Sequence, residues 1–314
     1  MGRKTHALAV AVALGALMAG CQANEDDRDD NDAEDERVSP FTGRQVTEDG
    51  PVLAVKIDNA PQARPHTGLD AADIVYVEPV EAGLSRLVAV YSTQLPELVG
   101  PVRSARESDL ELLRQFDEPA LAYSGVQSRL QPLIDDAELF PEPPEAAPDA
   151  YRRDESRAAP HNLYVRPETL LDAAPEASRA DDIGFTFGPA PESGGEPTAD
   201  YNVTYPSAAF SFSWSPDQER WAVAMDGAPT DLGAPTVVVQ KVTVRQSEYH
   251  DSRGNFTPYT ETVGSGEAVV LRDGQAFPAE WERDHEREGT EFTTPDGEPM
   301  NFAPGPVWVV FEPA

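Results

Sequence analysis

Two arginines stand in the string Gly100-Pro101-Val102-Arg103-Ser104-Ala105-Arg106. The string lies where an apolar strand is predicted to end and where a capping box, Ser104 to Glu107, predicts the start of a helix. A helix N-terminus favours anions, and guanidinium groups bind carboxylate and phosphate. Arg103, Ser104 and Arg106 therefore predict an anion-binding corner. The alternative is that both arginines pair with nearby carboxylates of the chain, namely those of Glu107, Asp109 and Glu111.

Three further side chains could move protons. His161 could act as a general acid or base, with Glu81 and Asp58 as candidate carboxylates beside it. Asp58 follows an apolar run, and ligands collect at the carboxyl ends of strands in open α/β sheets. The alternative for His161 is a structural loop histidine held by Asn162 and Tyr164.

No complete catalytic signature accompanies these residues. The sequence lacks His-Glu-x-x-His, Gly-x-Ser-x-Gly and Ser-x-x-Lys, which mark common zinc peptidases, hydrolases and penicillin-binding proteins. The only cysteine is Cys21, so the rest of the chain has no thiol for a disulfide, a nucleophile or a thiolate metal site. We predict neither a metal site nor a cofactor.

The elements that would position these residues alternate between strands and helices. Apolar runs predict strands at 52–57, 74–77, 87–91 and 120–123. Helical spacing follows Ser104 and recurs after Val126, and Pro167 begins a third helix as its first residue. This alternation predicts an α/β domain over residues 40–190, with a mixed sheet and flanking helices.

The second part of the chain has a different pattern. A Pro-, Gly- and Glu-rich loop at 189–199 predicts a boundary, and no helical signal follows Tyr201. Short apolar runs separated by Asp-Gly and Gly-Asn turns predict strands at 210–214, 221–225, 237–244, 268–271 and 307–311. We therefore expect a β-rich domain over residues 200–314.

The N-terminus resembles a secretory signal. Arg3 and Lys4 precede an uncharged stretch that ends in Leu17-Met18-Ala19-Gly20-Cys21, the layout of a bacterial lipobox. We predict a signal peptide over residues 1–20, lipidation of Cys21, and an acidic, disordered tether over residues 21–39. The membrane is then a partner through the lipid anchor, and the body lies on the outer face of the cytoplasmic membrane.

The chain is strongly acidic, with a formal charge of -32 from 56 acidic and 24 basic residues. Such a surface repels nucleic acid, so no nucleic-acid partner is expected. Lysine is almost absent, with Lys4, Lys56 and Lys241 only. Either salt adaptation or a GC-rich genome would account for this composition.

Short strings along the chain resemble the YerB-like lipoprotein family in order and spacing. They are Ile57-Asp58-Asn59, Arg64-Pro65, Glu81-Ala82-Gly83, Ser85-Arg86, Gly100 to Arg106 and Pro160 to Tyr164. The resemblance implies a lipid-anchored envelope protein with N- and C-terminal domains of unknown function. It also adds residues to the predicted ligand-binding set, which becomes Arg103, Ser104, Arg106, Asn59, Arg64, Arg86 and Asn162.

Three functional hypotheses follow. The first is an envelope lipoprotein that binds an anionic ligand or a cell-wall partner protein through its α/β domain, without established catalysis. The second is an enzyme acting on cell-wall glycan or peptide through His161, Glu81 and Asp58. The third is a purely structural interaction protein, in which these polar residues only support the fold. Convergence of Arg103, Arg106 and His161 on one concave site would favour the first two hypotheses over the third.

Overall fold

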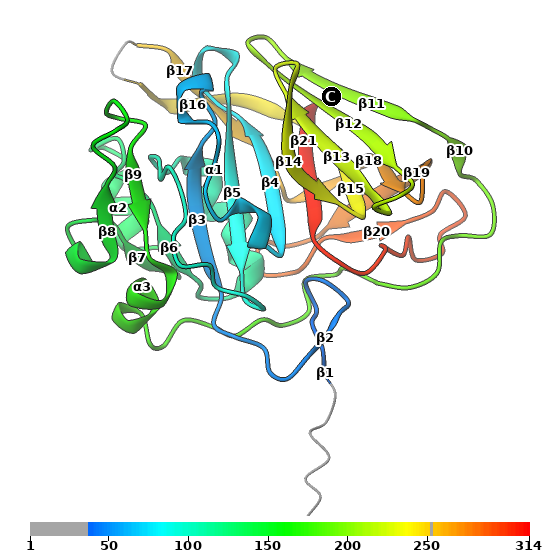
Figure 1. Cartoon of the computed structure of the whole chain (residues 1–314), viewed down its shortest axis with the longest axis horizontal. Coiled ribbons are helices and arrows are strands. Elements are labelled where there is room, and N and C mark those ends of the chain that lie inside the picture. The colour runs from blue at the N-terminus through cyan, green and yellow to red at the C-terminus, as the bar shows by residue number, and fades with distance from the viewer. Residues whose placement is uncertain (1–36, 252–253) are drawn as a thin grey trace, which may run out of the picture. The chain divides into compact units, whose positions relative to one another are not determined.

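The computed structural model describes residues 37–251 and 254–314. Its main feature is an eleven-stranded mixed sheet built from both parts of the chain (Figure 1). The strand order is β10 (Glu196–Pro197), β19 (Gln275–Arg283), β18 (Gly264–Arg272), β15 (Thr236–Val242), β21 (Val307–Pro313), β4 (Ile74–Pro79), β5 (Ser85–Tyr91), β3 (Leu53–Asp58), β6 (Ala120–Ala122) and β7 (Phe140–Glu142), with β20 (Glu291–Thr293) beside β19.

The last strand of the chain lies in the middle of this sheet. β21 pairs in parallel with β15 on one side and with β4 on the other, as the red strand between yellow and cyan ones in Figure 1. It therefore hydrogen-bonds the N-terminal strands to the C-terminal strands. The division at residues 190–200 stays a prediction, since the sheet itself runs across it.

One face of the large sheet packs against a second, four-stranded sheet. That sheet has the order β11 (Asp200–Tyr205), β12 (Ala208–Ser215), β13 (Arg220–Met225) and β14 (Ala228–Ala234). Successive side chains of a strand point to opposite faces. Accordingly Leu53 and Val55 of β3 share one core cluster with Phe212 and Trp221, whereas Ala54 belongs to the core on the other face.

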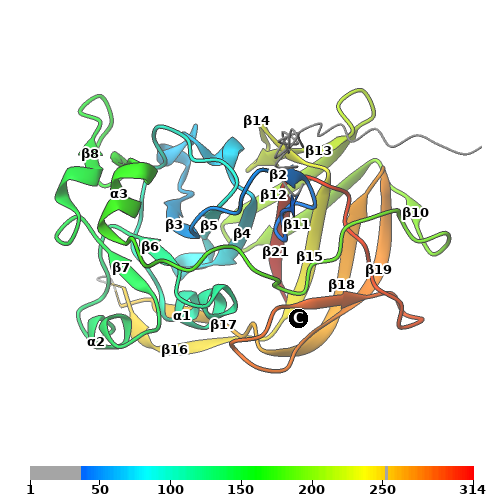
Figure 2. The same cartoon turned by 90° about the horizontal axis from the view of Figure 1, so that it is seen from below.

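The helices are few and short. They are α1 (Glu107–Leu113), α2 (Gln131–Asp135) and α3 (Pro167–Ala173). Single 3-10 turns complete the helical content, namely η1 (Pro61–Ala63), η2 (Leu69–Ala71), η3 (Glu81–Gly83), η4 (Arg114–Phe116) and η5 (Pro148–Ala150). Figure 2 shows α1 near the hairpin of β16 (Val244–His250) and β17 (Phe256–Thr260).

The predicted α/β class is wrong. Strands hold 43% of the described residues and helices 12%, and no layer of long helices flanks the sheet. The physical reason is that β5 pairs antiparallel with both β4 and β3, and antiparallel neighbours need no crossover helix between them. A second sheet then covers the face that flanking helices would otherwise bury.

Two local details also differ from the sequence reading. α1 begins after Arg106 rather than at Ser104, because the Asp109 carboxylate accepts the backbone N–H of Arg106 at 2.7 Å. With only seven residues, and with a carboxylate already at its first turn, α1 does not supply the helix-end anion site that the sequence predicted. Pro167, in contrast, is the first residue of α3, as predicted.

The remaining described strands form small hairpins, β1 (Arg37–Val38) with β2 (Gln45–Val46) and β8 (Tyr151–Arg153) with β9 (Leu163–Val165). No helix within residues 37–251 and 254–314 is long and apolar enough to cross a membrane. Cys21, the signal peptide and residues 21–36 of the predicted tether lie outside the described residues.

Candidate functional site

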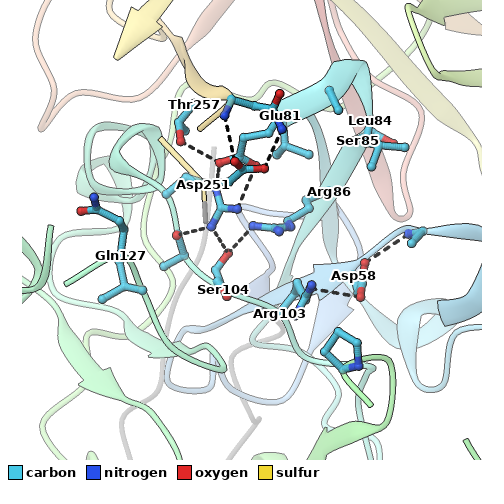
Figure 3. A pocket seen from close by; sticks show the side chains of 18 of the residues that line it. Asp58, Glu81, Leu84, Ser85, Arg86, Arg103, Ser104, Gln127, Asp251 and Thr257 are labelled. Carbon is cyan, nitrogen blue, oxygen red and sulfur yellow. Dashed lines mark hydrogen bonds and ion pairs between the residues drawn. The ribbon is translucent and has the colours of Figure 1, made fainter. Parts of the chain in front are cut away.

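A pocket of about 1060 Å³ lies at the carboxyl ends of β3 and β4, where the chain turns into β5 (Figure 3). Arg86 of β5 is paired with Asp58 of β3 on one side and with Glu78 of β4 on the other. Residues directly opposite one another in an antiparallel pair point to the same face. The register therefore gathers three ionisable side chains on one face at this end of the sheet.

The arginine-bearing string runs alongside β3. The N–H of Arg103 donates to the Lys56 carbonyl at 2.7 Å, and the N–H of Asp58 donates to the Pro101 carbonyl at 2.9 Å. Gly100 begins the string at a φ of +154°, and a Cβ there would lie 2.9 Å from the Leu163 carbonyl oxygen. The missing side chain thus lets the string pack against β9, which holds Arg103 beside Asp58.

At one end of the pocket, the Asp58 carboxylate contacts three neighbouring groups. Its Oδ2 lies 2.7 Å from Nδ1 of His161 and 3.2 Å from Nε of Arg103, and its Oδ1 accepts the N–H of Ala60 at 3.1 Å. The Asp58 side chain is almost fully buried, whereas His161 and Arg103 are partly exposed to the pocket. With its Nδ1 proton donated to Asp58, the imidazole presents Nε2 as its free nitrogen.

Glu81 and Arg106 form a second ion pair in the pocket wall. Arg106 reaches both carboxylate oxygens of Glu81, through Nε at 2.7 Å and Nη2 at 2.8 Å, and the Thr257 hydroxyl donates to Oε1 at 2.6 Å. Burial alone would raise the pKa of Glu81. The hydrogen bond and charge of Arg106, with the Thr257 hydroxyl, outweigh burial and lower that pKa below its ordinary value. Glu81 is therefore held as a carboxylate at neutral pH.

Arg86 has no carboxylate partner among the described residues. It is only 9% exposed and lines the pocket, yet its one hydrogen bond runs from Nη1 to the Ser104 carbonyl at 2.9 Å. The pKa of Arg86 is lowered to about 9, mainly by burial; the charges of Arg106 and Arg103 lower it further, whereas the carboxylates of Glu81 and Asp58 raise it. Its Nε and Nη2 have no partner in the described part of the chain, so one two-donor edge of the guanidinium remains unused.

A buried ionic triad lies on the same face of the sheet, and the sequence analysis missed it. Lys56, Glu78 and Asp109 are at most 1% exposed, and Nζ of Lys56 contacts Glu78 and also Oδ1 of Asp109, the latter at 2.5 Å. Asp109 also accepts the backbone N–H of Arg106, so the triad supports the pocket wall from inside the protein. A lysine within an otherwise apolar strand, in a chain with three lysines, was the signal that could have identified it.

Three residues of the predicted ligand set lie outside the pocket. Asn59 donates to the Ser85 hydroxyl at 2.9 Å and accepts from Nε of Arg64 at 3.0 Å. Arg64 also pairs with Asp226 of the turn between β13 and β14, at 2.8 Å. These two residues therefore connect the large sheet to the four-stranded one.

Asn162 is the third of these residues. It is buried, accepts from Nη1 of Arg153 at 2.8 Å and donates to two carbonyl oxygens of the loop that leads to His161. Its contacts hold that loop, and His161 with it. The pocket thus brings together the other seven predicted residues: Asp58, Glu81, Arg86, Arg103, Ser104, Arg106 and His161.

The C-terminal part supplies a wall of the pocket that the sequence did not indicate. The β16–β17 hairpin places Tyr249, His250, Asp251, Asn255 and Thr257 along it. No local pattern in the sequence links these residues to Glu81, more than 160 residues earlier. Within the described ranges, no three His, Asp or Glu side chains are grouped as metal ligands.

Comparisons with known proteins agree with this architecture. The models of the two domains described as protein of unknown function (DUF3048), N-terminal domain and C-terminal domain, match residues 41–180 and 201–309. The "Putative lipoprotein YerB" of Bacillus subtilis (strain 168) is 28% identical over 303 residues, which cover 88% of this chain and 86% of that protein.

A crystal structure of the YerB protein from Bacillus subtilis has the same fold. It superposes with a TM-score of 0.74 at 21% identity, over 88% of this chain and 97% of that one. The resemblance inferred from the short strings is thereby confirmed, and the comparison extends to a protein described as a lipoprotein. The chain belongs to the YerB-like family defined by the N- and C-terminal DUF3048 domains.

Proposed function

We propose that this protein is a lipoprotein anchored through Cys21 to the outer face of the cytoplasmic membrane, and that its pocket binds an anionic envelope ligand or a cell-wall partner that presents such a group. The lipobox-like N-terminus and the description of the Bacillus subtilis relative support the anchor. The arginine-lined pocket supports the binding role.

The observation that carries the binding proposal is the state of Arg86. A buried cation without a carboxylate in direct contact is unfavourable, because burial removes its hydration and the more distant carboxylates of Glu81 and Asp58 replace only part of the lost interaction. Arg103 shares one carboxylate, Asp58, with His161, and Arg106 is fully engaged by Glu81. An anion bound at Arg86 would supply the missing charge and accept the two unused N–H donors.

Inorganic phosphate is the simplest probe of this site. We expect phosphate to raise the unfolding temperature of the wild type above that in sodium chloride of equal ionic strength, because a ligand that binds only the folded state stabilises it. Arg86→Gln should remove this rise. Arg166→Gln is the matched control, since Arg166 also donates to a single backbone carbonyl, that of Asp149, but lies outside the pocket. Equal effects of phosphate and chloride on the wild type would reject the anion site.

The anchor has a separate test. Metabolic labelling with a palmitate analogue should mark the wild type, and Cys21→Ser should abolish the label and release the protein from the membrane. Undiminished labelling of the variant would reject lipidation at Cys21.

A second candidate function, catalysis on wall glycan or peptide, is favoured by the Asp58–His161 pair. A carboxylate on Nδ1 orients an imidazole and leaves Nε2 to accept or donate a proton, as in hydrolytic triads. Glu81 is a poor proton donor here because Arg106 keeps it ionised. If the pocket is catalytic, muropeptides incubated with wild type should change in mass, and His161→Gln should leave them intact. Unchanged muropeptides with wild type would argue against this candidate.

The third hypothesis, a purely structural interaction protein, receives less support. Arg103, Arg106 and His161 line one concave site, which favours a ligand or enzyme role over a set of scattered fold contacts. Arg106 also has a structural role, because its ion pair with Glu81 forms part of the pocket wall.

A further inference from the structure

The pocket is far larger than an inorganic anion requires. Its volume of about 1060 Å³ compares with about 300–1,000 Å³ for the clefts that enclose drug-sized organic ligands. The unused guanidinium edge of Arg86 accounts for one anionic group only. Most of the pocket is therefore available to the body of the ligand, and the residues that line it indicate what that body is.

An apolar wall lies away from the Asp58 end. Figure 3 places Gln127 and Asp58 on opposite sides of the pocket, with Arg86 and Ser104 between them. Next to Gln127 in the chain, Val126 lines the pocket together with Leu130 and Tyr249. Val126 and Tyr249 are partly buried against the core, and the remainder of each side chain faces the pocket. We refer to Val126, Leu130 and Tyr249 as the apolar wall; Leu130 is only 1% exposed, so Val126 and Tyr249 supply its accessible surface.

The apolar wall joins the two parts of the chain. Val126 and Leu130 come from the segment before α2, whereas Tyr249 comes from β16, and the Arg129 guanidinium lies 5.8 Å from the centre of the Tyr249 ring. A ligand whose uncharged part is apolar would remove this surface from water while its anionic group reaches Arg86. A compact inorganic anion would leave the apolar wall hydrated.

From this arrangement we infer that the ligand is an amphiphilic anion, in which an oxyanion head at Arg86 and Arg103 carries an apolar group that packs on the apolar wall. This inference rests on the proposed anion site and adds how the apolar part of the ligand is bound. The class comprises phosphate esters that keep a negative charge, and carboxylates, each with a short aliphatic or aromatic group. Inorganic phosphate and uncharged sugars fall outside it.

Titration calorimetry with inorganic phosphate and hexyl phosphate, at equal ionic strength, tests the inference. The wild type should bind hexyl phosphate more tightly, by about fourfold for each methylene that leaves water. Val126→Asn and Tyr249→Asn should each reduce this gain and leave the affinity for phosphate unchanged. Leu133→Asn is the control, because Leu133 is an exposed leucine of α2 outside the pocket. Melting curves would establish that the variants are folded.

The outcomes separate this inference from the proposal on which it rests. If the wild type binds both phosphates equally, or if the gain survives both apolar-wall variants, the amphiphile is rejected and the anion site stands. If the wild type binds neither compound, or if Arg86→Gln binds hexyl phosphate as tightly as wild type, the anion site itself is rejected and the amphiphile with it.

Discussion

The buried triad of Lys56, Glu78 and Asp109 makes the stability of this protein depend on pH through one residue. Two carboxylates compete for one ammonium group, and Oε1 of Glu78 has no hydrogen-bond partner in the described part of the molecule. The pKa of Glu78 is raised to about 7, mainly by burial; the Lys56 ammonium opposes this rise and the Asp109 carboxylate adds to it. Glu78→Gln would remove this ionisation and keep the shape of the side chain.

The magnitude follows from the linkage between proton binding and folding. The folded pKa of Glu78, about 7, exceeds its ordinary value of 4.5, so the folded state holds the proton more tightly than the unfolded state. The resulting stabilisation is fully present below pH 4.5 and is lost as the pH rises through 7. A difference of this size corresponds to roughly 3 kcal/mol in the free energy of unfolding.

Urea denaturation of the wild type and of Glu78→Gln at several pH values would measure the effect. The stability of the variant relative to wild type should grow by about 3 kcal/mol between pH 4.5 and pH 8, because only the wild type must bury a second carboxylate at the higher pH. Glu267→Gln is the control, since Glu267 pairs with Lys241 at the exposed surface. A difference between Glu78→Gln and wild type that does not change with pH would refute the reasoning.

Three further predictions concern the arginine-bearing string and the net charge. Arg106→Ala leaves a buried carboxylate unpaired and should lower the free energy of unfolding, measured by urea denaturation, by about 3–5 kcal/mol. Arg103 is 25% exposed, so Arg103→Ala should lower it by about 1 kcal/mol. Equal losses in the two variants would contradict the geometry. Gly100→Ala should lower the free energy of unfolding by about 2 kcal/mol or more, through a clash and an unfavourable φ. Gly194→Ala is the control and should cost less, because a Cβ there meets nothing within 4 Å. A smaller loss at Gly100 than at Gly194 would contradict this prediction. With a net charge of -32, the melting temperature should rise with sodium chloride, as the Debye length falls from about 10 Å at 0.1 M to about 3 Å at 1 M; a flat or falling midpoint would mean that the carboxylates are already compensated.

The parts of the fold that local patterns encode could be predicted. The apolar runs at 52–57 and 74–77 are β3 and β4, and the runs at 237–244 and 307–311 fall on β15 and β21. The same reasoning placed Asp58 and Arg103 at strand ends; Asp58 does end β3, whereas Arg103 follows isolated bridges and no strand, and both line the pocket. Such runs suffice because a short apolar strand buried on both faces has a local signature.

The partners of these strands could not be predicted from local patterns. The spacing of Leu110, Leu113 and Phe116 suggested a flanking helix, but it is divided between the seven residues of α1 and the 3-10 turn η4. The β16–β17 wall of the pocket and the place of β21 in the sheet depend on pairings between residues far apart in the chain. Those pairings are decided by packing over the whole molecule, which a single sequence read in short windows does not contain.

The central place of β21 determines when the large sheet can be completed. Without residues 307–313, the strands from β4 to β7 and the strands from β15 to β10 would be two separate sheets, each with a bare edge of unpaired N–H and C=O groups. Translation makes β21 after every other strand of this sheet, so the sheet cannot close before residues 307–313 have been made. Until β21 is in place, each of the two half-sheets has an edge that a strand of another molecule could join, so β21 also protects the folded protein from edge-to-edge association.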